Sequence, residues 1–336
     1  MVETDRDRTP SDQGRDRTPS DFITRLLAPY GPTRPIPELV VEVNRLFHAT
    51  GANLYDGSHP EIHQQLPEVW GDLLAQVHIP AGAQWSLLDF GAGTGFATAQ
   101  AINALPNGAV ERAVCVDLSP EMLAHCRTRI SPVMPQAEFR EDLPTQGPFH
   151  LLLTNSVLHH LPDVDAHLAR IEPLLAPDAW WVMGHEPSSR FYRNLELRAH
   201  FDAYRRQHRW QRFFRPGLYL ARLRRLFAGD PRRSAARASV AAGLFQREPD
   251  PETIDRLVDF GVAHSLEEVE AGRGLDFREM ERRFAGRWEL VTVRSYSFMG
   301  SMFEGYLPGG WQSRCQDLAR RFPEDGANFS AVWRRS

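Results

Sequence analysis

Short apolar runs and helix-forming stretches alternate through the middle of the chain. Apolar runs at residues 85–90, 112–117, 149–155 and 179–187 have the length and composition of buried strands, and residues 137–142 predict a shorter strand between them. The segments between these runs are typical of helices. Because this alternation is characteristic of a parallel sheet with helices on both faces, we predict an α/β, doubly wound fold.

The alternation stops after Pro187 and returns near the C-terminus. The next clear strand covers residues 288–300, and a helix at 309–322 and a last strand at 327–335 follow it. The last strand starts directly after a short turn, which predicts that it is antiparallel to its neighbour. We therefore expect a seven-stranded sheet that a long helical insertion interrupts.

This pattern divides the chain into four regions. Residues 1–21 contain the segment RDRTPSD twice and almost nothing apolar, so we expect a disordered leader. Residues 22–80 predict N-terminal helices, and residues 81–187 with 285–336 predict the sheet domain. Residues 188–284 are the insertion, for which we predict a helical lid that forms part of a ligand pocket.

Composition narrows the functional classes. No apolar run approaches the roughly 20 residues of a membrane span, and the N-terminus is charged, so we expect a cytoplasmic protein without a membrane partner. All 39 basic residues are arginine, which excludes lysine Schiff-base chemistry. The formal net charge of −4 gives no reason to expect a polyanionic partner. Three cysteines without zinc-ligand spacing predict buried thiols, namely Cys115, Cys126 and Cys315.

The glycine-rich segment after the first predicted strand indicates a nucleotide ligand. Its glycines are Gly91, Gly93 and Gly95, in the order D-x-G-x-G-x-G that starts at Asp89. The dinucleotide fingerprint needs its last glycine at the sixth position, which is Phe96 here. A carboxylate at Asp89 would repel a pyrophosphate and suit a ligand with an ammonium or sulfonium group. The loop therefore points away from NAD.

A second acidic residue follows at the end of the next predicted strand. Asp117 lies 22 positions beyond Gly95, at the tip of the strand that should neighbour the first one. A carboxylate there can accept both hydroxyl groups of an adenosine ribose. Together with the glycine loop, this spacing predicts an adenosine-bearing ligand at the carboxyl ends of the strands.

From about residue 40 to 336 the chain resembles the class I S-adenosylmethionine-dependent methyltransferases, which share a Rossmann-like fold. Four segments match family motifs in the right order, namely LLDFGAGTGF, VCVDLS, EDLP and LLTNSVLHHL. The resemblance implies S-adenosyl-L-methionine as cofactor and S-adenosyl-L-homocysteine as product. It also implies that Asp89 serves the ammonium end, that Asp117 binds the ribose and that Leu118 lies against the adenine. The remaining cofactor residues that it implies are Tyr55, Gly91, Gly93, Gly95, Asp142, Leu143, Asn155 and Ser156.

Methyl transfer from a sulfonium is a direct displacement, so a general base is needed only when the acceptor must lose a proton. Candidate bases lie where the fold would place the acceptor. His160, next to His159, follows the fourth strand, and His185 and Glu186 end the fifth. No chelating spacing requires a metal, and we predict none.

The insertion contains a basic, amphipathic helix. Around residue 200, an apolar face lies beside a stripe of arginines, which suits a lid that binds a carboxylate or phosphate of the acceptor. The same pattern also suits a solvated helix docked on acidic neighbours. The substrate-binding residues that we predict are Arg198, Tyr204, Arg205 and His208.

The leading functional hypothesis is methylation of a small-molecule acceptor, with natural product biosynthesis as its setting. Nucleic-acid methylation through the arginine-rich segment is an alternative. Against it, the fourth strand lacks the Asn-Pro-Pro-aromatic element of amino-methylating DNA enzymes, and an acidic segment follows the basic one at once. A cofactor-binding protein of the same fold that transfers no methyl group is a third possibility.

Overall fold

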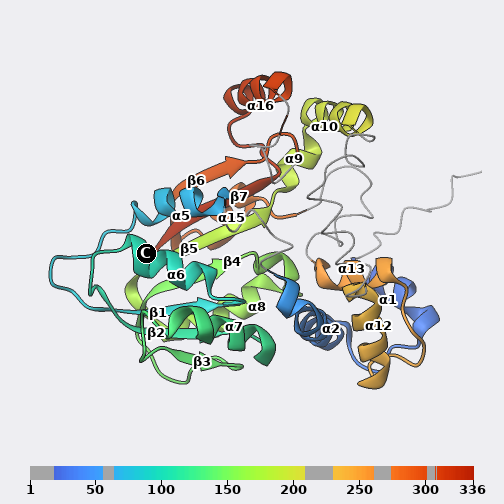
Figure 1. The fold of residues 1–336 in the computed structure, drawn as a ribbon, viewed down its shortest axis with the longest axis horizontal. Coiled ribbons are helices and arrows are strands. Elements are labelled where there is room, and N and C mark those ends of the chain that lie inside the picture. Colours follow the sequence, from blue (N-terminus) through green and yellow to red (C-terminus); the bar gives the residue numbers. More distant parts are fainter. Residues whose placement is uncertain (1–18, 56–63, 209–229, 261–273, 301–306, 308) are drawn as a thin grey trace, which may run out of the picture.

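A single seven-stranded sheet forms the centre of the protein (Figure 1). The computed structural model describes residues 19–55, 64–208, 230–260, 274–300, 307 and 309–336. The strand order is β3-β2-β1-β4-β5-β7-β6. The strands are β1 (Trp85–Phe90), β2 (Val110–Val116), β3 (Glu138–Arg140), β4 (Phe149–Asn155), β5 (Leu175–Pro187), β6 (Trp288–Tyr296) and β7 (Asn328–Arg335).

The sheet has the predicted mixture of strand directions. Strands β1 to β5 pair in parallel, and β7 is antiparallel to both of its neighbours, β5 and β6. This topology confirms the predicted doubly wound sheet with an antiparallel last strand. The carboxyl ends of β1, β2 and β4 consequently meet along one edge, which is where such sheets bind ligands.

Side chains alternate between two buried layers, because successive residues of a strand point to opposite faces. Leu87 and Leu151 pack beneath one helical layer, and Leu88 and Leu152 pack beneath the other; all four are fully buried. The first layer consists of α5 (Leu66–Leu74), α6 (Phe96–Ala104) and α7 (Pro120–Ile130). The second consists of α8 (Val164–Ile171) and α15 (Phe277–Phe284).

Four further helices form a separate core beside the strand ends, which we call the helical unit. They are α1 (Pro19–Leu27), α2 (Ile36–Gly51), α12 (Pro231–Ala241) and α13 (Pro251–Val258). The side-chain amide of Asn44 in α2 donates to the carbonyl of Leu257 in α13 over 3.2 Å. The N-terminal segment and part of the insertion therefore fold together, as Figure 1 shows.

The other described parts of the insertion lie elsewhere. Helices α9 (Ser189–Arg193) and α10 (Leu195–His208) pack with α16 (Gly309–Arg321) at the top of Figure 1. Helix α15, which the sequence pattern assigned to the insertion, packs on the sheet because Phe277 and Phe284 are buried against it. Residues 209–229 and 261–273 of the insertion lie outside the described residues.

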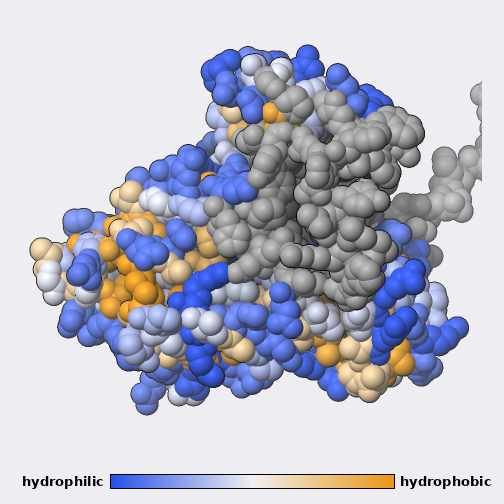
Figure 2. All heavy atoms as spheres, viewed as in Figure 1, coloured by the Kyte–Doolittle hydropathy of each residue, from blue (hydrophilic) through white to orange (hydrophobic). Residues whose placement is uncertain are grey.

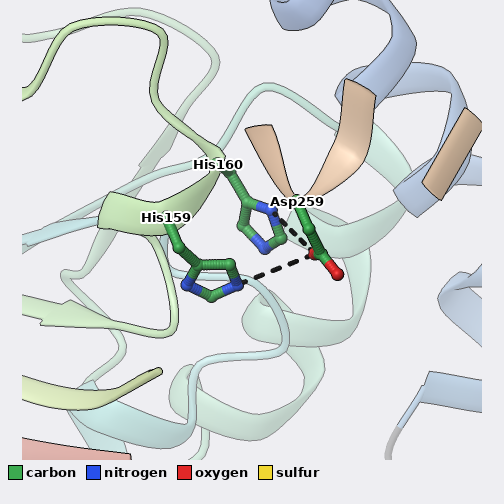
Figure 3. A group of neighbouring side chains, drawn as sticks. All are labelled: His159, His160 and Asp259. Carbon is green, nitrogen blue, oxygen red and sulfur yellow. Dashed lines mark ion pairs between the residues drawn. The ribbon is translucent and has the colours of Figure 1, made fainter. Parts of the chain in front are cut away.

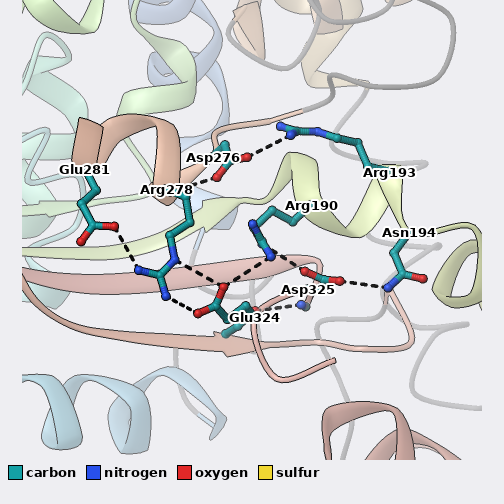
Figure 4. A network of polar contacts seen from close by, with 10 residues as sticks. Arg190, Arg193, Asn194, Asp276, Arg278, Glu281, Glu324 and Asp325 are labelled. Atoms are coloured by element: carbon teal, nitrogen blue, oxygen red, sulfur yellow. Dashed lines mark hydrogen bonds and ion pairs between the residues drawn. The ribbon is translucent and has the colours of Figure 1, made fainter. Parts of the chain in front are cut away.

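A polar network holds these segments to the sheet (Figure 4). The guanidinium of Arg190 in α9 pairs with Asp325, 3.0 Å away, in the turn before β7. Arg278 of α15 pairs with Glu324 in the same turn, and Arg193 of α9 lies 3.0 Å from Asp276. The first of these pairs joins residues that are 135 positions apart, so the network fixes the point at which the insertion leaves the sheet.

Hydrophilic residues cover most of the face shown in Figure 2, and apolar residues gather over the region of α6 at its left. Among the described helices, none combines the length and the apolar character that crossing a membrane would require.

Candidate functional site

A pocket lies at the carboxyl ends of the parallel strands, against the helical unit. Its sheet side consists of the glycine loop, the ends of β2 and β4 and the loop after β3, and its other side is α2. This is the edge at which the sequence predicted a ligand. The predicted cofactor residues that line the pocket are Tyr55, Gly91, Gly93, Asp117, Leu118, Asp142, Leu143, Asn155 and Ser156.

The glycine loop is a tight turn with left-handed backbone angles. Gly91 has φ +71°, and a Cβ atom there would lie 2.4 Å from Cγ2 of Val157, so only glycine fits. The amide of Gly91 donates to the carbonyl of Val116 over 2.8 Å, which ties the loop to the end of β2. The loop therefore lies flat against the pocket wall, where a ligand can approach its backbone.

Two of the predicted cofactor residues do not line the pocket. Gly95 begins α6 with φ +83°, and a Cβ atom there would lie 2.9 Å from Sγ of Cys126, so this glycine lets α6 and α7 approach. Asp89 is fully buried, and its Oδ2 accepts hydrogen bonds from the amide and hydroxyl of Thr98 over 3.1 and 2.6 Å. Burial raises the pKa of Asp89 to about 7 despite the bonds from Thr98. The geometry thus favours a structural role for Asp89 over contact with a ligand ammonium group.

Asp117 and Leu118 form the wall after β2. The two carboxylate oxygens of Asp117 accept the amide hydrogens of Gly93 and Ser119 over 2.8 and 2.9 Å. Burial raises the pKa of Asp117, and the two backbone hydrogen bonds oppose that shift. Leu118 is 44% exposed and borders the pocket. A fixed carboxylate beside an uncovered leucine matches the needs of a ribose and an adenine ring.

The end of β4 is held in an uncommon conformation. Ser156 has φ +58°, and its amide donates to the carbonyl of Gly184 over 2.8 Å. Next to it, the side-chain oxygen of Asn155 accepts the indole N–H of Trp70 over 3.0 Å. A non-glycine residue with positive φ costs about 1–3 kcal/mol and is frequent at functional sites. Both residues line the pocket, as the family resemblance implies for its cofactor site.

Glu186 does not line the pocket. Its carboxylate is fully buried and accepts hydrogen bonds from the amides of Val157 and Leu158, both over 2.9 Å. It also accepts the amide of His159 over 3.2 Å and pairs with Nδ1 of His159 over 2.8 Å. A carboxylate engaged by four donors is poorly suited to remove a proton from an acceptor. The geometry therefore favours a role for Glu186 in holding the turn at 157–160, in place of the predicted role as base.

His160 is the predicted base that lines the pocket. Its Nδ1 lies 2.7 Å from the carbonyl of Val258, so this nitrogen carries the hydrogen and Nε2 has the lone pair. Burial lowers the pKa of His160 well below its ordinary value, and the neighbouring His159 and His48 lower it further. A neutral imidazole with one fixed tautomer can accept a proton or a hydrogen bond.

His185, the third predicted base, lies one residue before Glu186 and has φ +56°. Its ring contacts the hydroxyl of Tyr296 at 3.0 Å, and its amide donates to the hydroxyl of Ser330 over 2.9 Å. It is 8% exposed and is absent from the residues that line the pocket. The structure thus brings His160 to the pocket and leaves His185 in the sheet.

Three potential metal ligands lie together where the turn after β4 meets α13 (Figure 3). Ring nitrogens of His159 and His160 lie 3.9 and 3.8 Å from Oδ1 of Asp259. However, the His160 nitrogen concerned already donates to Val258, so it cannot ligate a metal without breaking that bond. We therefore interpret the group as a polar cluster that joins the turn to the end of α13.

The predicted substrate-binding residues lie on α10, and the three of them whose side chains the structure describes are not among the residues that line the pocket. Tyr204 packs edge-on against Trp311 of α16 with ring centroids 5.3 Å apart, and the guanidinium of Arg205 lies over the ring of Phe201. Arg198 donates to the carbonyl of Tyr192, and the side chain of His208 is outside the described residues. The described contacts therefore dock α10 on α16 through aromatic packing, and the contacts of Arg198 and Arg205 are to a carbonyl and a ring, not to acidic side chains.

Sequence reasoning missed the contribution of α2. Asn44, Arg45 and His48 line the pocket, and the ring of His48 packs edge-on against that of His160 with centroids 5.3 Å apart. The available signal was a polar residue, Asn44, on the apolar face that buries Val40. Periodicity alone could not show that this face borders a ligand.

Comparison with known proteins agrees with this geometry. A family model described as a methyltransferase domain matches residues 88–181, which run from within β1 to about the middle of β5. The trans-aconitate 2-methyltransferase of Methylobacterium nodulans is 33% identical over 137 residues, covering 39% of this chain and 51% of the relative. The chain thus spans about half the length of this curated relative.

Two solved methyltransferase structures align with this chain at low sequence identity. The plantazolicin methyltransferase BpumL in complex with SAH aligns with a TM-score of 0.44 and 11% identity, over 90% of this chain and 97% of that chain. An S-adenosylmethionine-dependent methyltransferase from Mesorhizobium loti aligns with a TM-score of 0.42 and 14% identity, over 79% and 97%. The motif order, the sheet topology and the match of residues 88–181 to a methyltransferase domain are all consistent with a class I S-adenosylmethionine-dependent methyltransferase.

Proposed function

We propose that this protein transfers the methyl group of S-adenosyl-L-methionine to a small-molecule acceptor. The observation that carries the proposal is the shared lining of the pocket. The glycine loop and Asp117 supply the cofactor side, and Asn44 and His48 of α2 face them from the helical unit. A pocket enclosed between two packed bodies suits a small acceptor better than a polymer.

The described residues fit the cofactor. Asp117 is held by two backbone amides, so its carboxylate is fixed where the ribose hydroxyls would bind, and the exposed Leu118 offers an apolar surface for the adenine. Asp142 and Leu143, from the loop after β3, would border the adenine edge. When bound, the cofactor supplies an electrophilic methyl group, and the protein must align the acceptor and exclude water.

An anionic metabolite is the first acceptor class to test. The name of the curated relative identifies trans-aconitate, a small carboxylate, as the substrate of that protein. A carboxylate is ionised at neutral pH and needs no general base, whereas a hydroxyl acceptor must lose a proton. With a hydroxyl acceptor, the neutral His160 would accept this proton through Nε2, because its Nδ1 donates to Val258.

The His160→Gln variant should separate these two acceptor classes. With a hydroxyl acceptor we expect turnover to fall by roughly 10²–10⁴-fold, the usual contribution of a general base, with little change in cofactor affinity. With a carboxylate acceptor we expect a much smaller loss. Methyl transfer from radiolabelled cofactor to trans-aconitate and to hydroxylated metabolites would measure both, and full activity on a hydroxyl acceptor would exclude His160 as the base.

The Asp117→Ala variant tests the cofactor site itself. Removing the carboxylate leaves the amides of Gly93 and Ser119 without their acceptor and deletes the ribose contact. A hydrogen bond to a charged group contributes about 1.5–3 kcal/mol, so the affinity for S-adenosylhomocysteine should fall roughly 10- to 100-fold. Calorimetric titration measures this loss.

The control for this experiment is Asp178→Ala, which removes an exposed carboxylate in β5 and should leave the affinity unchanged. NAD serves as the control ligand. Unchanged affinity in Asp117→Ala would contradict the site, and absence of binding to both S-adenosylmethionine and its product would contradict the proposed function. Cofactor binding without transfer to any acceptor would favour the third hypothesis, a binding protein of this fold.

A further inference from the structure

The turn after β4 and the end of α13 are joined by a continuous chain of polar contacts. It starts at the carboxylate of Glu186, passes through both ring nitrogens of His159 and ends at Asp259, the residue after α13. Glu186 belongs to the sheet, whereas α13 belongs to the helical unit. The chain therefore crosses between the two bodies that enclose the pocket (Figure 3).

At its sheet end, the chain fixes the turn that carries His160. Glu186 accepts three consecutive backbone amides, those of residues 157, 158 and 159, as an anion does at the start of a helix. Ser156 and His185, which flank this contact, both have positive φ although neither is glycine. Such backbone strain persists only where surrounding contacts hold the backbone in place. The contact between Glu186 and the turn therefore has a fixed geometry.

At its other end, the chain meets the C-terminus of α13. The last carbonyl groups of a helix lack partners within the helix, and His160 donates to one of them, that of Val258. His159 brings a second imidazole to the same terminus, where a positive charge is favourable. Helix α13 packs on α2, which lines the pocket, so the position of α13 sets the position of that wall.

We propose that Glu186, His159 and Asp259 form a positioning device that orients His160 and holds the helical unit over the cofactor pocket. These are positioning residues, because they act on the pocket through the turn and through α13. The inference rests on the proposed function in one respect, namely that S-adenosylhomocysteine is the ligand used to probe the pocket.

The charge on His159 gives this device a measurable signature. The titratable groups that face its ring are Glu186 from β5, Asp259 after α13 and His160 on the same turn, with His48 of α2 beside His160. Burial alone would lower the pKa of His159, but the charge and hydrogen bond of Glu186 and the charge of Asp259 outweigh it, and the pKa is raised above 6.5. The ion pairs of protonated His159 with Glu186 and Asp259 are thus present below this raised pKa. They are lost as the pH rises through it.

The first experiment measures the histidine directly and needs no ligand. In protein labelled with ¹⁵N-histidine, with EDTA present, the ring signals are followed by NMR from pH 5 to 9 and are assigned with the His159→Gln variant. We expect His159 to titrate above 6.5, and to titrate at lower pH in Asp259→Asn. A His159 ring that titrates at or below 6.5 in the wild type would overturn the proposal.

The second experiment tests whether the charge on His159 affects ligand binding in the pocket. The affinity for S-adenosylhomocysteine is measured at pH 6 and pH 8.5 in the wild type, in His159→Gln and in a matched control, His78→Gln, which replaces an exposed histidine. We expect the wild type and the control to lose affinity at least threefold more than His159→Gln on going to pH 8.5. Equal pH dependence in all three would contradict the coupling, even if each protein folds.

The two experiments distinguish failure of the proposed function from failure of the positioning device. If no variant binds S-adenosylhomocysteine, the proposed function fails, while the NMR titration still tests the pairing of His159. If binding is normal but His159→Gln has the pH dependence of the wild type, only the positioning device fails.

Discussion

Replacing Gly91 with alanine should abolish measurable binding of S-adenosylmethionine. Gly91 has φ +71°, a conformation that costs an alanine about 1–2 kcal/mol. The new Cβ atom would also lie 2.4 Å from Cγ2 of Val157, and overpacking of this kind costs about 1–3 kcal/mol. The loop and the turn after β4 cannot both keep their places, and both line the pocket. Calorimetric titration and urea unfolding would measure the two effects.

Gly82 offers a matched control for this prediction. It has φ +76°, close to that of Gly91, but a Cβ atom there would meet no other atom within 4 Å. Gly82→Ala should therefore show the backbone strain alone and keep its cofactor affinity. In the double variant Gly91→Ala/Val157→Ala, removal of the valine methyl groups should restore part of the stability. Equal losses in Gly91→Ala and Gly82→Ala would show that contact with Val157 is not the cause.

Replacing Asp89 with asparagine should remove a large pH dependence of stability. The pKa of Asp89 is about 7 in the folded protein, against 3.8 ordinarily, because the carboxyl group is buried. Between these values the folded state holds a proton that the unfolded state has released, so the free energy of unfolding falls as the pH rises. At about 1.4 kcal/mol for each pKa unit, the loss reaches up to about 4 kcal/mol by pH 7. The asparagine side-chain amide would resemble the protonated carboxyl group and would not ionise.

Urea unfolding at pH 5, 6, 7 and 8 would test this expectation. Relative to the wild type, Asp89→Asn should gain stability as the pH rises, and the exposed Asp178→Asn should follow the wild type throughout. The experiment also bears on the role that the family resemblance implies for Asp89. If Asp89→Asn keeps the slope of the wild type but loses cofactor affinity more than tenfold, its carboxylate serves the ammonium group of the cofactor.

The sheet was accessible to sequence reasoning because its signals are local. The run from Trp85 to Phe90 is fully apolar except for Ser86 and Asp89, and the predicted strand has the bounds of β1 in the structure. The antiparallel direction of β7 followed from the short turn before it. Helix α15 belongs to the predicted lid insertion but packs on the sheet, because a short amphipathic helix has the same pattern whether it covers a sheet or another helix.

The wall of the pocket at the strand ends was predictable for a related reason. Gly91, Gly93 and Asp117 occupy fixed places relative to strand ends, and the ends of neighbouring parallel strands meet at one edge. The surroundings of the predicted substrate-binding residues were not predictable in this way. Arg205 and Tyr204 form an amphipathic pattern that suits a lid, yet Tyr204 packs on Trp311, which lies more than 100 residues away in the sequence.

By itself the sequence determined the fold class and predicted which edge of the sheet carries the pocket, because periodicity, glycine spacing and strand-end acids are properties of neighbouring residues. Only the tertiary structure decided which of three candidate bases reaches the pocket. Glu186 and His185 are neighbours at the end of β5. The carboxylate of Glu186 accepts the amides of residues 157–159, whereas the ring of His185 lies against Tyr296. Likewise, the second wall of the pocket comes from α2, which α13 holds in place from over 200 residues further along the chain. Such contacts depend on how distant segments pack, and no local pattern encodes them.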